Sequence, residues 1–411
     1  MRTAIIALAT LLATAPVAAA PLELHRGVGV HGWFNWSPLE ADGSYRWPPY
    51  LTQAEWLASE RPASDWPAGD PFELIRSLGF DFVRLTVDPG PLLASSRQRR
   101  QEALALLAEG VKAVTAADLR VVFNIHPVSQ VPAYSNDLVN GPANAPGVAL
   151  YRDMIADLAR MLTPLGTDKV VLEPFNEPAH YPCDASGSDD WQQIMASTVA
   201  AIRAVSTELT IVATGACGGN VDGVTDLDPH FDDPNIFYSF HMYEPHLFTH
   251  QRADREEDFA SGLPWPASEG SPEAVRAMLA AHMDAAGVPP GEQARQLAAV
   301  SGYIDEYFRE GWGEEQMEAR VGQAVAWAEA HGIPTSRLFM GEFGVILMTE
   351  DGRAGAFNAD RLRYLETLRK LAERHGIPWA VWEFSNPHGM SVIVPKGPAV
   401  PDRKMLEALG L

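Results

Sequence analysis

The chain has 411 residues, of which 46% are hydrophobic and 20% are charged, which describes a globular protein large enough for one large barrel or two medium domains. Its formal net charge of −22 argues against nucleic acid, anionic membranes or polyanionic substrates as partners. A neutral ligand such as a sugar is compatible with so acidic a surface.

Residues 1–20 have the pattern of a secretory signal peptide. Arg2 supplies the positive charge, residues 4–16 form a short apolar stretch, and small residues at 18–20 mark a cleavage site. The apolar stretch is short for a membrane span, which favours a cleaved signal peptide over the alternative of an uncleaved anchor. We expect residues 21–411 to form a single domain and the mature protein to be secreted or periplasmic, without membrane insertion.

Short apolar strands alternate with helical patterns along the rest of the chain. The expected strands are Gly27–Gly32, Phe82–Val87, Arg120–Ile125, Lys169–Pro174, Leu209–Thr214, Ile236–His241, Leu338–Gly341 and Trp379–Trp382. The expected helices include Pro71–Leu78, Arg97–Ala117, Val148–Leu162, Asp190–Ser206, Asn358–His375 and Arg403–Leu409. This alternation predicts an α/β fold with an all-parallel sheet.

At this length, a closed (β/α)8 TIM barrel is favoured over an open doubly wound sheet. The open sheet is further disfavoured because no glycine-rich dinucleotide fingerprint follows the first strand.

One connection breaks the rhythm of strands and helices. Residues 244–313 separate the sixth strand from the helix before the seventh, and they contain two helical patterns, Pro272–Ala286 and Gly291–Tyr307. Long insertions of this kind usually serve as lids, binding loops or small accessory subdomains. Because this helical insertion leaves from the carboxyl end of a strand, we expect it to lie over the active-site face.

The two cysteines, Cys183 and Cys217, follow the fourth and fifth expected strands. Neighbouring loops on one face of a barrel bring such positions together, and an even cysteine count in an oxidising compartment favours a disulfide. We expect one bridge between two loops that border the site. Two unpaired buried thiols are the alternative.

Polar or amphipathic residues stand at the carboxyl ends of six expected strands. They are Arg84, His126, Asn176, Glu177, His241, Tyr243, Glu342 and Trp382. The carboxyl ends of barrel strands meet at one face and build the active site. Glu177 and Glu342 are therefore expected to face one pocket, and two facing carboxylates are what glycoside hydrolysis needs.

In this chain order, the eight residues resemble those of glycoside hydrolase family 5, the cellulase-type retaining β-glycanases of clan A. The resemblance spans essentially the whole mature chain and no member of the set is missing. It implies a catalytic domain in which Glu177 is the general acid/base and Glu342 is the nucleophile of a retaining mechanism. It also implies that the partner is a neutral β-linked oligo- or polysaccharide.

The nucleophile and the acid need different surroundings, because the acid must hold a proton near neutral pH while the nucleophile must be ionised. Arg84, as a fixed cation, favours the ionised form of Glu342, and Tyr243 is placed to donate to the same carboxylate. Asn176, beside Glu177, is suited to bond the sugar 2-hydroxyl, a contact that strengthens in the transition state.

The remaining members of the set are suited to holding the sugar. His126 and His241 can bond hydroxyls and position the two carboxylates. Trp382 offers a flat apolar face on which a pyranose can stack, and Trp33 and Trp36 are expected to line one side of the cleft.

No cofactor and no metal are expected. The sequence has no His-Glu-x-x-His helix or close-spaced ligand pair, and a nicotinamide-dependent barrel oxidoreductase is disfavoured because its phosphate-binding signature is missing. A sugar-binding barrel without turnover is the non-enzymatic alternative, and the intact pair of glutamates argues against it.

The identity of the sugar polymer stays open at this stage. Gly32-Trp33-Phe34 looks like a motif of exo-acting β-glucanases in the family, whereas Asn124-Ile125-His126-Pro127 is nearer the endo-acting branch. We expect an endo-β-1,4-glucanase-like enzyme that acts as a monomer. An exo-acting β-glucanase or β-glucosidase and a mannanase are the alternatives.

Overall fold

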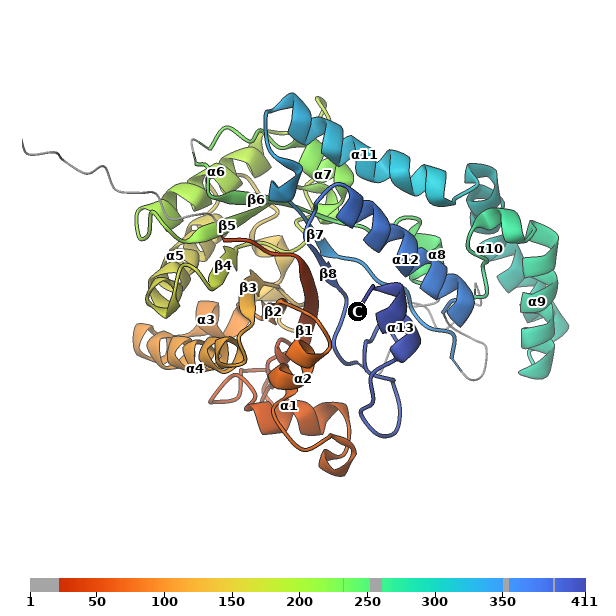
Figure 1. Cartoon of the computed structure of the whole chain (residues 1–411), viewed down its shortest axis with the longest axis horizontal. Helices are drawn as coiled ribbons and strands as arrows, with labels where there is room; N and C mark the ends of the chain where they lie inside the picture. The colour runs from red at the N-terminus through yellow and green to blue at the C-terminus, as the bar shows by residue number, and fades with distance from the viewer. Residues whose placement is uncertain (1–21, 232, 252–260, 350–354, 387–388) are drawn as a thin grey trace, which may run out of the picture.

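A computed structural model describes residues 22–231, 233–251, 261–349, 355–386 and 389–411 (Figure 1). The predicted signal peptide, residues 1–20, lies outside the described residues. Among the helices that are described, none is long and apolar enough to span a bilayer.

Eight parallel strands form a closed barrel in which each strand pairs with the next and β1 pairs with β8. The strands are β1 (Arg26–Phe34), β2 (Phe82–Val87), β3 (Arg120–Ile125), β4 (Val170–Glu173), β5 (Thr210–Thr214), β6 (Ile236–His241), β7 (Leu338–Glu342) and β8 (Trp379–Val381). The predicted α/β TIM barrel is therefore confirmed, and the open doubly wound sheet is excluded.

Helices surround the strands (Figure 1). They are α1 (Gln53–Glu60), α2 (Pro71–Ser77), α3 (Gly90–Ala94), α4 (Arg97–Ala116), α5 (Pro146–Leu162), α6 (Asp190–Arg203), α7 (Val221–Asp226), α8 (His246–Thr249), α9 (Pro272–Ala285), α10 (Pro290–Glu310), α11 (Glu314–Ala330), α12 (Asn358–Arg374) and α13 (Arg403–Ala408). The long helices bury one apolar stripe each: in α5, for example, Tyr151, Ile155 and Leu158 recur at helical spacing and are buried.

The interior of the barrel changes from apolar to polar along the strands. One end is closed by a buried apolar cluster of Leu22, Leu24, Phe82, Val122, Val171, Val212, Phe237, Phe339 and Ala380. Side chains alternate along a strand, so the residues two positions further point into the same interior. On β2, β3 and β4 these are Arg84, Asn124 and Glu173, all fully buried. The polar layer thus lies directly beneath the carboxyl ends of the strands.

Several short helices were not expected from the sequence. Helix α1 lies between the first expected strand and the first expected helix, where no element was predicted, and it begins with a capping box in which Thr52 and Glu55 bond each other's backbone N–H groups. Helix α7 lies in the connection between β5 and β6, where the Asn220 side chain accepts from the Gly223 N–H. Both helices are only one or two turns long, so they leave a weak periodic signal in the sequence.

The insertion, residues 244–313, was expected to lie over the active-site face, but only its first residues, among them His246 and His250, do so. Its two long helices lie beside the barrel. Helices α9 and α10 bury apolar stripes against each other and lie at the edge of the molecule, outside α12 (Figure 1). Trp265, just before α9, packs on Tyr364 of α12 with ring centroids 5.1 Å apart. The flank of α12 thus supplies the apolar partner that these helices need.

Candidate active site

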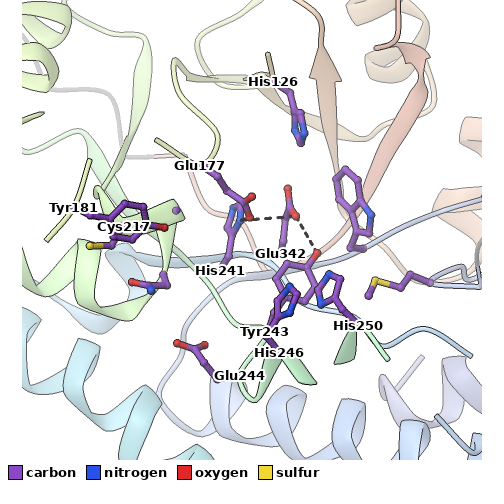
Figure 2. Close-up of a pocket in the computed structure, with 14 residues that line it drawn as sticks. His126, Glu177, Tyr181, Cys217, His241, Tyr243, Glu244, His246, His250 and Glu342 are labelled. Atoms are coloured by element: carbon purple, nitrogen blue, oxygen red, sulfur yellow. Dashed lines mark hydrogen bonds and ion pairs between the residues drawn. The ribbon is translucent and has the colours of Figure 1, made fainter. Parts of the chain in front are cut away.

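A cavity of about 450 Å³ opens at the carboxyl ends of the strands, the face where TIM barrels carry their active sites. Figure 2 shows how the side chains of several strands converge on it. Predicted residues that line it are His126, Glu177, His241, Tyr243, Glu342 and Trp382. Arg84 and Asn176 lie directly beneath and contact these residues.

The two glutamates come from different strand ends and face each other. Glu177 follows β4 and Glu342 ends β7, and one carboxylate oxygen of each lies within 4.8 Å of the other and of a His241 ring nitrogen. His241 Nδ1 is 2.7 Å from Glu177 Oε1 and 3.8 Å from Glu342 Oε2. His241 therefore stands between the two carboxylates and fixes their relative position.

The buried guanidinium of Arg84 holds the base of the site together. Its Nη1 lies 2.5 Å from Glu342 Oε1 and its Nη2 lies 2.9 Å from Asn176 Oδ1. Its Nε and Nη2 also bind both oxygens of Glu173, at 2.7 and 3.1 Å. Burial alone would lower the pKa of Arg84, but attraction from Glu173 and Glu342 raises it above its ordinary value, so the side chain stays charged.

Glu173 is a residue of the site that the sequence reasoning missed. Its side chain is fully buried and is the bidentate partner of Arg84. The sequence does carry a signal, because a glutamate two residues after Val171 in a buried strand must point to the same interior. A buried acid there requires a buried cation, and Arg84, which points inward from β2, is the cation that pairs with it.

The carboxylate of Glu342 is oriented by two donors. The Tyr243 hydroxyl donates to Oε2 at 2.9 Å (Figure 2), while Arg84 donates to Oε1. Burial raises the pKa of Glu342, and the neighbouring Glu177 adds to this rise. His241, Arg84 and the Tyr243 hydroxyl all act in the opposite direction, because each stabilises the ionised form.

The carboxyl group of Glu177 is poised to hold a proton. Burial raises its pKa to about 7, although Arg84 and His246 act against the rise. The side chain as a whole is 37% exposed, so it opens into the cavity. Because Arg84 Nη2, which can only donate, lies 3.5 Å from His241 Nε2, the His241 proton sits on Nδ1 and is donated to Glu177.

An aromatic wall closes another side of the cavity. The rings of His126 and Trp382 are nearly parallel, with centroids 5.9 Å apart, and His31 packs against both at 4.9 Å. The Trp36 indole N–H donates to His31 Nε2 at 3.1 Å, and Trp36 is 52% exposed. His31 was not predicted as a site residue because it lies within β1, three residues before the end of the strand.

Trp33 does not line the cleft, so that prediction was wrong. Its side chain is 4% exposed, stacks on Phe34 and Trp56, and donates through Nε1 to the Leu51 carbonyl at 3.0 Å. The physical reason is a register shift in β1 between Val30 and Phe34, which breaks the simple alternation of inward and outward side chains.

A disulfide joins Cys183 and Cys217, the pair expected from the sequence, with an S–S distance of 2.01 Å. Cys217 lines the cavity. Further lining residues that the sequence reasoning did not single out are Tyr181, Gly218, Asn220, Glu244, His246, His250 and Met390. All of them lie in connections after strands, where no periodic pattern marks an inward side chain.

A parallel barrel that presents two facing glutamates at its strand ends defines a glycoside hydrolase. The chain belongs to glycosyl hydrolase family 5: the model of that family, described as Cellulase, matches residues 51–388. The family expected from the sequence is therefore confirmed.

Two curated relatives carry related names. Endoglucanase 3 of Fibrobacter succinogenes is 26% identical over 197 residues, which span 47% of this chain but only 26% of that protein. Cellodextrinase A of Ruminococcus flavefaciens is 23% identical over 307 residues, which span 74% of each chain. This chain therefore covers about a quarter of the first relative and most of the second.

Solved structures agree with the fold. Two structures of Thermotoga maritima Cel5A, one in complex with cellobiose and one with mannotriose, each superpose with a TM-score of 0.63 at 18% sequence identity. Each superposition covers 94% of this chain and 97% of the other.

Hydrolytic activity is expected to survive exhaustive chelation. Glu177, His241 and Glu342 are close enough together to be considered as metal ligands, but the charged guanidinium of Arg84 already lies against Glu342 and repels a cation there. The check is reducing-sugar release before and after dialysis against EDTA. A loss of activity that added Zn²⁺ or Mg²⁺ restores would contradict this prediction.

Proposed function

We propose that this chain is an exported, retaining endo-β-1,4-glucanase. The observation that carries the mechanism is the closeness of the two carboxylates, whose nearest oxygens lie within 4.8 Å of each other. Retaining enzymes place their two carboxyl groups ~5–5.5 Å apart, whereas inverting enzymes need ~6.5–9.5 Å to admit a water molecule. The separation here supports direct attack by a carboxylate.

In the proposed first step, the Glu342 carboxylate attacks the anomeric carbon while the Glu177 carboxyl gives its proton to the glycosidic oxygen. A glycosyl ester on Glu342 forms as the leaving sugar departs. In the second step, the Glu177 carboxylate takes a proton from water, which attacks the same carbon and releases Glu342. A pKa of about 7 for Glu177 suits both roles near neutral pH.

The surrounding residues support this division of labour. Arg84 and Tyr243 each bind one oxygen of Glu342, so the carboxylate is held in place before substrate arrives. Arg84 also donates to the side-chain amide oxygen of Asn176, Oδ1. The side-chain NH2 group of Asn176 is then the group that can donate to a sugar hydroxyl. Trp382 in the cavity and the exposed Trp36 beside it supply faces for stacked pyranose rings.

The names of the relatives favour β-1,4-glucan as the substrate. Endoglucanase 3 is named for internal cleavage of a glucan, and Cellodextrinase A is named for the cleavage of cellodextrins. The mannotriose complex of Cel5A keeps mannan as the second candidate. Internal cleavage is favoured because helices α9 and α10 contribute no residue to the lining of the cavity in the described part of the chain.

Export is proposed from the N-terminal pattern of Arg2 and the apolar residues that follow it. The Cys183–Cys217 disulfide is compatible with an oxidising compartment outside the cytoplasm. We further propose that residues 21–411 act as one catalytic domain and that the protein works as a monomer.

The mature protein is expected to release reducing sugar from soluble β-1,4-glucan, giving a mixture of oligosaccharides early in the reaction. The same assay should be run on mixed-linkage glucan, β-1,3-glucan and mannan. Cellobiose or glucose as the sole early product would show exo action, and a preference for mannan would replace the proposed substrate. Inactivity on every polymer and on aryl cellobiosides would contradict the proposal.

A further inference from the structure

Tyr181 is an exposed aromatic residue that lines the cavity. It lies in the connection between β4 and α6, four residues after Glu177, and its side chain is 66% exposed. At this exposure the tyrosine ring buries little apolar surface, so its burial contributes little to folding. Its open face is available to a ligand.

The connection that carries Tyr181 is fastened to the neighbouring connection after β5. The Cys183–Cys217 disulfide joins the two connections two residues beyond the tyrosine. The Cys217 N–H donates to the His180 carbonyl at 3.0 Å, and the Gly218 N–H donates to the Pro178 carbonyl at 2.8 Å. Tyr181 is therefore held on both sides by covalent and backbone bonds.

Gly218 allows the tyrosine to lie close to this support. Its φ of +66° is in the left-handed region that favours glycine. A Cβ at this position would lie 3.0 Å from the Tyr181 hydroxyl oxygen. The phenol thus rests against a backbone without a side chain, which restricts where the ring can lie.

The position of Tyr181 relative to the two glutamates indicates which part of a substrate it meets. In Figure 2, Tyr181 and Cys217 lie on the side of Glu177 that faces away from Glu342. Glu342 approaches the anomeric carbon of the sugar that becomes esterified, and Glu177 approaches the oxygen that departs. Beyond Glu177 lies the leaving sugar.

We propose that Tyr181, held in place by the Cys183–Cys217 disulfide, is the stacking platform for the sugar on the leaving-group side of the cleaved bond. This inference rests on the proposed retaining glucanase function. It makes Tyr181 a specificity-determining residue that favours oligosaccharide over small leaving groups. It also explains why a disulfide lies at the rim of the cavity.

The test uses Tyr181→Ala with two substrates. Cellotetraose must place sugars beyond Glu177, so its kcat/KM is expected to fall about tenfold, the scale of one lost stacking contact. 2,4-Dinitrophenyl β-cellobioside has a good leaving group, so its first step is fast and hydrolysis of the glycosyl-enzyme limits kcat. The leaving group has departed before that step and no longer contacts Tyr181. The kcat on this substrate is therefore expected to change less than about twofold.

Tyr303→Ala is the matched control, because Tyr303 is also an exposed tyrosine, at 54%, but lies on α10 and outside the lining of the cavity. It is expected to leave both substrates unchanged. Tyr181→Phe keeps the ring and is expected to retain most of the cellotetraose activity. The double variant Cys183→Ser, Cys217→Ser is expected to lower cellotetraose kcat/KM, with no further loss when combined with Tyr181→Ala.

An equal loss on both substrates, or no loss on either, would overturn the proposed platform while leaving the proposed hydrolase intact. Full additivity of the cysteine and tyrosine variants would overturn the role of the disulfide. Inactivity of the unaltered protein on both substrates would overturn the proposed function itself, so the two failures are distinguishable.

Discussion

Replacing Glu342 by alanine is expected to lower kcat on soluble β-glucan by roughly 10⁴- to 10⁶-fold, because no other group can form the covalent intermediate. Tyr243 and Arg84 each lose a bond to the carboxylate, but neither can attack the anomeric carbon. Arg84 keeps both bonds to Glu173, so its buried charge remains compensated and the variant is expected to fold.

The stereochemistry of a rescued reaction distinguishes a nucleophile from a structural carboxylate. Alanine leaves space in which azide can attack the anomeric carbon of 2,4-dinitrophenyl β-cellobioside directly. One displacement inverts the configuration, so the product is expected to be the α-glycosyl azide. Glu315→Ala removes an exposed glutamate on α11 and serves as the control. Substantial activity without azide, or a β-azide product, would remove Glu342 from the role of nucleophile.

The barrel was predictable because its signals are short-range and repeated. Each buried strand is a short, largely apolar run, as in Val170-Val171-Leu172, and helical patterns recur between these runs. Parallel strands in a closed barrel must bring their carboxyl ends to one face, so the topology alone places Arg84, His126 and Glu342 near one another. Predicting the residues at the strand ends therefore required no knowledge of distances.

The remaining features depend on departures from that regular geometry. Trp33 is two residues after His31, so simple alternation would point both side chains into the barrel. The register shift in β1 instead places the Trp33 side chain in the buried layer between the strand and the helices. The insertion leaves from a strand end, yet its path is decided by where α9 and α10 find apolar surface, which is the flank of α12. Such long-range packing choices leave no periodic signal in the chain.

Replacing Glu177 by alanine is expected to lower kcat/KM on cello-oligosaccharides by about 10³-fold, because a sugar alkoxide leaves poorly without a proton. With 2,4-dinitrophenyl β-cellobioside, whose leaving group needs no proton, the first step is expected to be nearly unaffected. The second step then lacks its base, so the glycosyl ester on Glu342 should accumulate and appear as a burst of dinitrophenolate. Azide should restore turnover with the β-glycosyl azide as product, the opposite configuration to that expected from Glu342→Ala.

The pH profile gives an independent check of the same residue. As a general acid, Glu177 acts while it holds its proton, so kcat/KM on cello-oligosaccharides is expected to fall as the pH rises through its pKa of about 7. The value lies this high because burial penalises the carboxylate more than Arg84 and His246 stabilise it. In Glu177→Ala the alkaline limb should disappear, because the group that titrates there is gone. Persistence of that limb in the variant would assign it to another group and would leave the proton donor to be sought elsewhere in the cavity, which His241, His246 and His250 also line.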